Sequence, residues 1–445
     1  MMKTPIYDFC KKYAEDDILR LHMPGHKGQN ILGFESLDIT EVDGADSLFD
    51  AESIIQQSEK NASSLFGADT FYSTEGSSLC IRTMLYLACM YARENGQKLK
   101  IAAGRNTHKS FLSASALLDF DIDWLYGDDD SYLSCTISAK KIDEYLEKEP
   151  EKPCALYLTS PDYLGNMCDI EEISKVCKKH KILLLVDNAH GAYLKFLEKS
   201  MHPIDFGASM CCDSAHKTLP VLTGGAYLHI SHSLDSSFKD YAKNAMSLFA
   251  TTSPSYLILE SLDIANRYIC EGYQEKLKEC IKRVDFIKEK LKEKEIEFLD
   301  NEPLKLTILP KSFGYTGEGF AKCLLEENIM CEFKDPDFTV LMFTPEISEI
   351  DFLKLCNAIE KTERKPPICQ KAPSLSKPIT KMTIRDAVFS PKEELPVKDC
   401  AGRILASVSV SCPPAVPIVV SGEVIDEKAI EVFTYYGIKS CIVVT

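Results

Sequence analysis

One lysine stands where a covalent bond to a cofactor could be made. Lys217 lies in the stretch Ser214-Ala-His-Lys-Thr-Leu-Pro220, shortly after an apolar run that ends at Cys212. The glycine pair Gly224-Gly225 and a β-like run at 226–230 follow it. Lysine amines form Schiff bases with carbonyl groups, and ligands of open α/β sheets lie at the carboxyl ends of strands. Taken alone, the stretch fits a cofactor-holding lysine or an exposed His-Lys pair.

If Lys217 holds pyridoxal phosphate, the cofactor needs further partners, and the sequence offers them in chain order. Gly76-Ser77-Ser78 directly precede an apolar helix, and helix N-termini favour anions such as phosphate; a serine N-cap is the alternative. Asp187 follows the apolar run 182–186, where a buried carboxylate needs a cationic partner such as a pyridinium nitrogen; a helix-capping aspartate is the alternative. His108 could stack on the ring, or it could be an exposed loop histidine. The candidates to surround the phosphate are Ser77, Ser78, Ser214 and His216.

An alternation of apolar strands and amphipathic helices positions these residues. Strands are expected at 99–103, 121–126, 155–159, 182–186, 208–212 and 226–230. Helices are expected at 4–20, 54–66, 79–91, 137–146, 170–180 and through most of 254–294. Continuous apolar strands between amphipathic helices predict an α/β fold with a parallel-type sheet covered on both faces.

The pattern of the remaining third of the chain indicates smaller folded units. Its expected strands are 295–299, 305–309, 339–343 and 440–444, and its expected helices are 317–327, 350–360 and 383–387. Four prolines between Arg364 and Pro378 mark a linker. We therefore divide the chain into an N-terminal segment (1–60), a cofactor-binding major domain (61–292), a small α/β domain (293–363), the linker (364–381) and a C-terminal domain (382–445).

Composition narrows the class of partner. The chain carries 51 lysines and arginines against 67 acids, a formal charge of −16, so nucleic acid and anionic membrane surfaces are not expected partners. The sequence has no apolar run of 18 residues and no signal-peptide core at its start. Its 18 cysteines are scattered, which indicates reduced thiols in the cytoplasm and no metal site.

Several motifs together resemble one family. They are His22-Met-Pro-Gly-His-Lys-Gly28, Glu75-Gly-Ser-Ser78, Arg105-Asn-Thr-His-Lys-Ser110, Asp187-Asn-Ala-His-Gly-Ala192, the Lys217 stretch, Thr251-Thr-Ser-Pro-Ser-Tyr256, Pro413-Pro-Ala-Val-Pro-Ile418 and Gly422-Glu423. With them the chain resembles the Orn/Lys/Arg decarboxylases, and within that family the shorter branch that lacks an N-terminal wing domain. The resemblance implies fold type I (aspartate-aminotransferase-like), with a three-layer α/β/α major domain.

The resemblance also implies a role for each candidate residue. Lys217 would carry pyridoxal phosphate as a Schiff base, Asp187 would pair with the pyridine nitrogen, and His108 would stack on the ring. His190 would lie near the cofactor and the substrate carboxylate. The phosphate would be held by Ser77, Ser78, Ser214, His216 and the partner subunit's Thr252. Family members are at least homodimers with active sites at the subunit interface, and they convert arginine, lysine or ornithine to the amine and CO₂, a reaction of polyamine biosynthesis.

Two features depart from the family's pattern. Gly224-Gly225 stand where the family more often has a glutamine, and Asn188 stands where shorter relatives often have an acid. Both lie close to the expected cofactor loops, so they leave the substrate open. The alternative functions are a pyridoxal-phosphate aminotransferase or lyase acting on another amino acid and, in a different class, a catalytically silent regulatory homologue.

Overall fold

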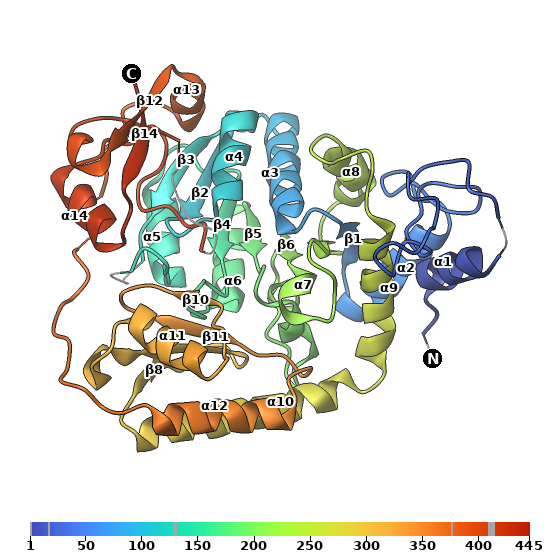
Figure 1. Ribbon diagram of the computed structural model, residues 1–445. Helices are drawn as coiled ribbons and strands as arrows, with labels where there is room; N and C mark the ends of the chain where they lie inside the picture. The colour runs from blue at the N-terminus through green and yellow to red at the C-terminus, as the bar shows by residue number, and fades with distance from the viewer. Residues whose placement is uncertain (1, 17, 128–130, 375–376, 408–413) are drawn as a thin grey trace. The chain divides into compact units, whose positions relative to one another are not determined.

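A computed structural model describes residues 2–16, 18–127, 131–374, 377–407 and 414–445 (Figure 1). Pro413 of the C-terminal proline pair and part of the expected linker lie outside these residues. The chain forms two compact units, and each is described by itself. The first unit comprises Met1–Lys98, Leu146–Tyr157 and Asp169–Lys276, and the second comprises Leu99–Tyr145, Leu158–Cys168 and Leu277–Thr445. The five domains expected from sequence therefore stay a prediction.

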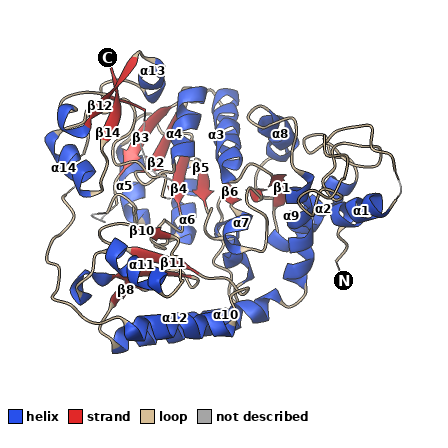
Figure 2. Ribbon diagram, viewed as in Figure 1, coloured by secondary structure: helices blue, strands red, loops and turns tan. Residues whose placement is uncertain are grey.

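Helices and strands alternate through the first two thirds of the chain (Figure 2). The helices are α1 (Pro5–Glu15), α2 (Ile54–Phe66), α3 (Ser77–Glu94), α4 (Lys109–Leu118), α5 (Ala139–Lys148), α6 (Ile170–His180), α7 (Ala215–Thr218), α8 (Ser236–Ser247), α9 (Tyr256–Cys270) and α10 (Tyr273–Glu293). The strands are β1 (Asp69–Ser73), β2 (Lys100–Gly104), β3 (Asp121–Leu125), β4 (Ala155–Thr159), β5 (Leu183–Asp187), β6 (Met210–Asp213) and β7 (Ala226–Ile230). Two 3-10 helices, η1 (Ala192–Phe196) and η2 (Pro203–Phe206), precede β6.

These seven strands form one sheet in the order β1-β7-β6-β5-β4-β2-β3. Its pairs β5–β6 and β2–β3 are parallel, as expected. The expectation of a parallel-type sheet is wrong for β7, which pairs antiparallel with both β6 and β1. All residues of β5, β6 and β7 are buried. Short strands that are apolar throughout carry the same pattern in either direction, so the sequence did not reveal the reversal.

Local capping explains where several helices begin and end. α6 begins after Asp169, whose carboxylate accepts a hydrogen bond from Glu172 N, and lysines occupy its last turn. The first helix ends at Glu15 because Asp16 adopts extended backbone, so the expected helix over 4–20 is too long. The sequence analysis also missed α8, whose N-cap Asp235 accepts from Ser237 N at 2.9 Å.

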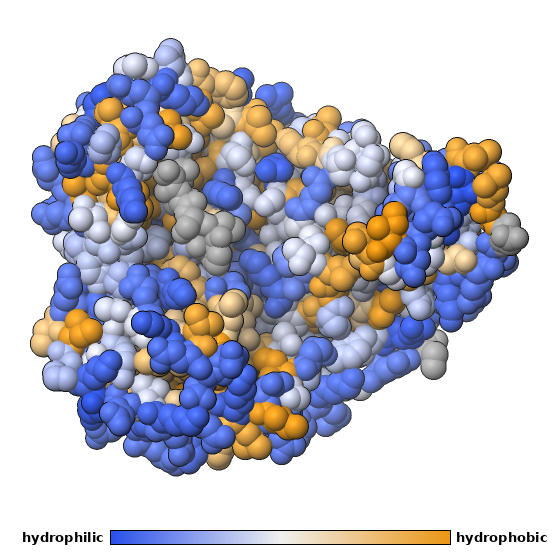
Figure 3. Space-filling view, in the orientation of Figure 1, coloured by the Kyte–Doolittle hydropathy of each residue, from blue (hydrophilic) through white to orange (hydrophobic). Residues whose placement is uncertain are grey.

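The N-terminal segment exposes apolar side chains. In the first unit α1, α2 and α9 pack together (Figure 1), and the loop after α1 is closed by Glu35, whose carboxylate accepts backbone N–H bonds from residues 31–34. Burial opposes ionisation, but these bonds lower the pKa of Glu35 to about 2. The exposed apolar residues are Ile18, Leu19, Leu21, Met23, Ile31, Leu32 and Phe34, and hydrophobic surface gathers over this part of the chain in Figure 3.

The second unit contains two smaller sheets. One has the order β10-β11-β9-β8, formed by β8 (Glu297–Leu299), β9 (Lys305–Leu309), β10 (Phe333–Lys334) and β11 (Thr339–Met342), with α11 (Gly317–Glu326), α12 (Glu349–Lys361) and η3 (Pro310–Phe313). The other has the order β12-β14-β13, formed by β12 (Lys392–Pro396), β13 (Leu405–Ser407) and β14 (Ser440–Val444), with α13 (Ile384–Phe389), α14 (Glu427–Tyr435) and η4 (Val397–Asp399). The sequence analysis missed β10, β12, β13 and α14. Across the described ranges, no helix combines the length and apolarity needed to traverse a lipid bilayer.

A buried ion pair holds the C-terminal segment to the loop after β2 within the second unit. Arg105 Nη2 donates to Glu423 Oε2 at 2.9 Å and to Ile418 O at 3.1 Å. The Glu423 side chain is 1% exposed, and the Arg105 guanidinium also lies over the Trp124 ring at 5.1 Å. Removing one partner of such a pair leaves a buried charge without compensation.

Glu423→Ala is expected to lower the free energy of unfolding by about 3 kcal/mol, because it leaves the buried Arg105 guanidinium without its carboxylate partner. The matched control is Glu393→Ala, which breaks the solvent-exposed pair between Glu393 and Arg403 and should cost below about 1 kcal/mol. Urea denaturation of the full chain measures both values. Equal losses of unfolding free energy in the two variants would show that the buried ion pair of Glu423 contributes no more than the exposed one.

Candidate active site

Lys217 lies on a one-turn helix that starts directly after a buried strand. β6 ends at Asp213, Ser214 is the N-cap of α7, and Lys217 is the third residue of that helix. Lys217 Nζ lies 3.0 Å from His190 Nε2, and its backbone N donates to Ser214 O at 2.9 Å. The helix fixes the backbone of the lysine while its amine faces an imidazole, an arrangement suited to holding or moving a proton.

Asp187 is a buried carboxylate at the end of β5, with 2% of its surface exposed. The hydrogen bonds it accepts come from neutral donors: Tyr157 Oη at 3.1 Å, Ala189 N at 3.2 Å and Cys212 Sγ at 3.7 Å. Burial raises the pKa of Asp187, and the charge of nearby Lys217 opposes that rise. A carboxylate in this setting is stabilised when a further positive group binds beside it.

The first turn of α3 offers its backbone N–H groups to an anion. Gly76 is the N-cap, with φ of 68°, and no side chain caps the turn. Ser77 and Ser78 are the first two helical residues, so the alternative of a serine N-cap is wrong. Ser214 Oγ donates to Ser77 Oγ at 2.9 Å. Hydroxyls from α3 and from the segment before Lys217 thus meet where the helix dipole favours negative charge.

The glycine pair after Lys217 has a backbone role at this turn. Gly224 O accepts a hydrogen bond from Gly76 N at 2.7 Å. Gly224 has φ of 101°, and a β-carbon there would lie 2.8 Å from Thr74 O; on Gly225 it would lie 2.3 Å from a Val221 methyl group. A larger residue at Gly224 would collide with the backbone just before α3, and one at Gly225 would collide with the Val221 side chain.

His216 lies beside the same turn. Its Nδ1 lies 2.9 Å from Gly225 O, which can only accept, so Nδ1 carries a proton. Burial lowers the pKa of His216, and the charge of Lys217 lowers it further. The neutral ring therefore presents Nε2 as an acceptor, and His216 can donate to a phosphate only if anion binding protonates it.

The roles predicted for His108 and Thr252 stay predictions. His108 belongs to the second unit, where it caps α4: its Nδ1 lies 3.2 Å from Ser110 N and 2.9 Å from Ser110 Oγ. Thr252 is exposed on the loop before α9 in the first unit. The first unit by itself brings together Lys217 with His190, and Ser77 with Ser214.

The sequence analysis missed three side chains at this site. Tyr157 and Cys212 donate to Asp187 from the neighbouring strands β4 and β6. Both lie in apolar runs, where the sequence pattern indicates only a buried core. Thr218, next to Lys217, is 1% exposed, and its hydroxyl has no partner among the described residues. A buried hydroxyl of this kind is a candidate ligand contact.

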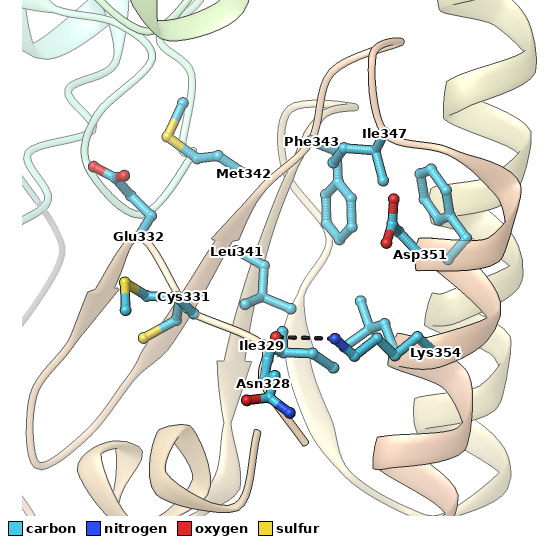
Figure 4. Close-up of a pocket in the computed structure, with 13 residues that line it drawn as sticks. Asn328, Ile329, Cys331, Glu332, Leu341, Met342, Phe343, Ile347, Asp351 and Lys354 are labelled. Atoms are coloured by element: carbon cyan, nitrogen blue, oxygen red, sulfur yellow. Dashed lines mark hydrogen bonds between the residues drawn. The ribbon is translucent and has the colours of Figure 1, made fainter. Parts of the chain in front are cut away.

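A separate pocket lies in the second unit (Figure 4). Its volume is about 520 Å³, and residues of β11, α12 and the segment 328–332 line it. The side chains are mainly apolar, among them Ile329, Leu341 and Phe343, and Lys354 Nζ donates to Asn328 O at 3.1 Å. None of the predicted site residues lines this pocket.

The first-unit residues fit pyridoxal phosphate. They provide an amine at Lys217, a buried carboxylate at Asp187 whose donors among the described residues are neutral, and an uncapped helix N-terminus at Gly76. These groups match the aldehyde, the pyridine nitrogen and the phosphate of that cofactor. No metal ligand is needed for any of the three.

Comparisons with known proteins show which family the chain resembles. The profile of the Orn/Lys/Arg decarboxylase major domain matches residues 4–303, and that of the family's C-terminal domain matches residues 371–440. The arginine decarboxylase of Bacillus subtilis (strain 168) is 30% identical over 96% of this chain and 92% of its own length. That of Halalkalibacterium halodurans is 28% identical, with the same coverage. A lysine decarboxylase of Francisella novicida superposes with a TM-score of 0.80 at 18% identity, covering 99% of this chain and 81% of its own.

The fold is that of the fold type I enzymes that depend on pyridoxal phosphate, as the sequence analysis predicted. A serine palmitoyltransferase from Sphingomonas wittichii shares it, with a TM-score of 0.57 at 13% identity over 81% of this chain and 83% of its own. The chain belongs to the Orn/Lys/Arg decarboxylase family. The prediction of an amino-acid decarboxylase, a carboxy-lyase, is thereby confirmed.

Proposed function

We propose that this protein decarboxylates a basic amino acid, with arginine the first candidate, using pyridoxal phosphate held by Lys217. The observation that carries the proposal is the pairing of Lys217 Nζ with His190 Nε2 at 3.0 Å, in the same unit as the buried Asp187 carboxylate. The curated relatives named arginine decarboxylase support arginine over lysine and ornithine.

The residues of the first unit would share the work of binding. Asp187, oriented by Tyr157 and by Ala189 N, would keep a positive charge on the pyridine nitrogen. When bound, pyridoxal phosphate supplies an electron sink for the electron pair of the bond between Cα and the carboxylate. The phosphate contacts would come from Ser77, Ser78, Ser214 and His216, with the partner subunit's Thr252. His108 keeps its proposed role as the residue that stacks on the ring.

Proton movement would depend on the pair formed by Lys217 and His190. Their nitrogen atoms are at hydrogen-bond distance, so a proton can pass between them without rearrangement of the backbone. His190 is 5% exposed, which keeps bulk water from competing for that proton. We propose that one of the two delivers the proton to Cα after CO₂ leaves.

We further propose a homodimer located in the cytoplasm. The apolar side chains exposed between residues 18 and 34, among them Leu19, Leu21 and Ile31, are 79%, 83% and 74% exposed. Clustered exposed apolar residues mark protein contact surfaces, and a second copy would cover them. The polyamine pathway is the proposed metabolic setting.

The test is an assay of the purified protein with added pyridoxal phosphate and one amino acid at a time. Arginine, lysine and ornithine are compared, with glutamate as the control of opposite side-chain charge. We expect stoichiometric CO₂ and amine from a basic amino acid, most rapidly from arginine, and neither product from glutamate. Formation of a keto acid with retention of CO₂ would support the aminotransferase alternative instead.

A further inference from the structure

A buried carboxylate that the proposed function does not use lies one residue before Ser214. Asp213 is fully buried. Its Oδ2 accepts from His202 Nε2 at 3.0 Å and from His229 Nε2 at 3.1 Å, and its Oδ1 accepts from Asn188 Nδ2 at 2.6 Å. The group is an ionised acceptor with three donors.

The protons of this network can be assigned consistently. His202 Nδ1 accepts from Ile204 N at 3.4 Å, so the neutral ring carries its proton on Nε2. Burial lowers the pKa of His229, although Asp213 opposes the change. The Thr70 hydroxyl has one proton and two acceptors within reach, His229 Nδ1 at 2.9 Å and Ala68 O at 3.2 Å. The shorter contact takes the proton, so a neutral His229 with its proton on Nε2 accepts at Nδ1. Each donor faces an acceptor, and Asp213 carries the charge.

The same assignment argues against a metal ion. Ligand atoms of His202, Cys211 and Asp213 lie within 4.8 Å of one another, as they would around a divalent cation. A metal needs the lone pair of His202 Nε2, and a neutral metal-bound ring carries its proton on Nδ1. Nδ1 already accepts from Ile204 N. The cluster is therefore a hydrogen-bond network.

The network crosses adjacent strands of the sheet. Thr70 lies on β1, His229 on β7 and Asp213 on β6, and Asn188 follows β5 directly. These strands are neighbours in the order β1-β7-β6-β5. Side-chain bonds thus link the four strands near the end of β6 that leads to α7.

One of these bonds joins the two segments that carry Asp187 and Lys217. Asn188 is the residue after Asp187, and Asp213 lies shortly before Lys217 in the chain. Two backbone hydrogen bonds join the same segments, from Asn188 N to Cys212 O at 3.0 Å and from Ser214 N to Ala189 O at 3.3 Å. The side-chain bond adds a third tie, whose other end is anchored by two buried imidazoles.

We propose that Asp213 is a positioning residue: through Asn188 it sets the separation of Asp187 and Lys217. The inference rests on the proposed function, in which these two residues hold the cofactor at its ring nitrogen and at its aldehyde carbon. Asp213 contacts neither group directly. A loss of the tie lets the two segments shift, and cofactor binding depends on both being in place at once.

Exchanging the amide and the carboxylate tests the proposal. Asn188→Asp sets two carboxylates against each other. Asp213→Asn removes the charge of the acceptor, and it keeps a bond to Asn188 only if one of the two amides turns over. We expect each single variant to raise the dissociation constant of pyridoxal phosphate about tenfold, the usual effect of removing a partner from a buried hydrogen bond. In the double variant the amide at 213 donates to the carboxylate at 188, so we expect recovery to within about threefold of the wild type.

Asp46→Asn is the matched control. Asp46 is also buried in the first unit, and its carboxylate accepts from Ser53 N, Ser53 Oγ and Ile55 N, away from the lysine segment. We expect a loss of thermal stability comparable to that of Asp213→Asn, with cofactor affinity unchanged. Wild-type affinity in Asn188→Asp, or no recovery in the double variant, would overturn the proposal. A wild-type protein that does not bind pyridoxal phosphate would instead refute the proposed function.

A measurement on the wild-type protein does not depend on the folding of any variant. Nitrogen-15 NMR of the cofactor-free protein should find His202 and His229 as neutral rings protonated on Nε2. Their signals should stay unchanged when zinc is added. A doubly protonated ring, or a zinc-dependent shift at either histidine, would overturn the assignment on which the positioning role depends.

Discussion

Lys217→Ala is expected to abolish decarboxylation, with a loss of at least about ten-thousandfold in turnover. The variant removes the amine that would hold pyridoxal phosphate covalently, and with it the group 3.0 Å from His190 Nε2. The visible absorption band of the purified protein, which borohydride should bleach in the wild type, is expected to be absent. Mass spectrometry of the reduced wild-type protein should find the added cofactor mass on the peptide that contains residues 214–225.

Lys195→Ala is the matched control for this change. Lys195 lies in the same unit and is largely buried, where it forms an ion pair with Asp205 at 2.5 Å. Its loss should reduce stability while the absorption band and the turnover persist. If the Lys217→Ala protein kept a band that borohydride removes, another lysine would be the anchor, and the arrangement with His190 would need another explanation.

The main elements of the fold could be predicted from apolar runs and their spacing. The strands at 155–159 and 226–230 and the helices at 54–66 and 170–180 have the expected bounds. The direction of β7 could not be predicted, because a short, wholly apolar strand has the same residue pattern whether it pairs parallel or antiparallel. The end of α1 at Glu15 was missed because Ile18 and Leu19 continue a helical pattern, although they are 46% and 79% exposed.

The candidate site divides in the same way. Lys217 and Asp187 could be identified because each comes shortly after an apolar run, where burying a charge costs free energy unless the charge has a partner. The bond between Asn188 and Asp213 could not be predicted, because it depends on the register of β5 against β6. Asn188, which stands where shorter relatives often have an acid, donates its amide to Asp213. A carboxylate at 188 would face a second one at 2.6 Å, so the residues at 188 and 213 constrain each other.

Asp187→Asn is expected to move activity and stability in opposite directions. Decarboxylation should fall by about a thousandfold, because a neutral amide cannot keep a positive charge on the pyridine nitrogen. The cofactor-free protein should become more stable at neutral pH, by roughly 1 kcal/mol, because the substitution removes a buried charge whose hydrogen-bond donors are neutral. Urea denaturation of the cofactor-free protein and steady-state kinetics of the holoenzyme measure the two effects.

The gain in stability expected for Asp187→Asn should depend on pH. Burial raises the pKa of Asp187 in the folded protein, so the folded state binds the proton more tightly than the unfolded chain does. The stability that the protonated group contributes is present in full below the unfolded pKa, and it is lost as the pH rises through the folded pKa. The advantage of the Asn variant should therefore be absent in acid, grow across that interval and level off above it.

Asp263→Asn separates the charge effect from the catalytic effect. Asp263 is fully buried in the same unit, burial raises its pKa to about 6, and it accepts from Ile6 N and Ser58 Oγ. Its stability should show the same kind of pH dependence as that of Asp187, while turnover stays near that of the wild type. Added pyridoxal phosphate should stabilise the wild type and the Asp263 variant far more than the Asp187 variant. Equal stabilisation of the wild type and both variants by pyridoxal phosphate would show that the cofactor does not contact the Asp187 carboxylate. Asp187 would then have a structural role only.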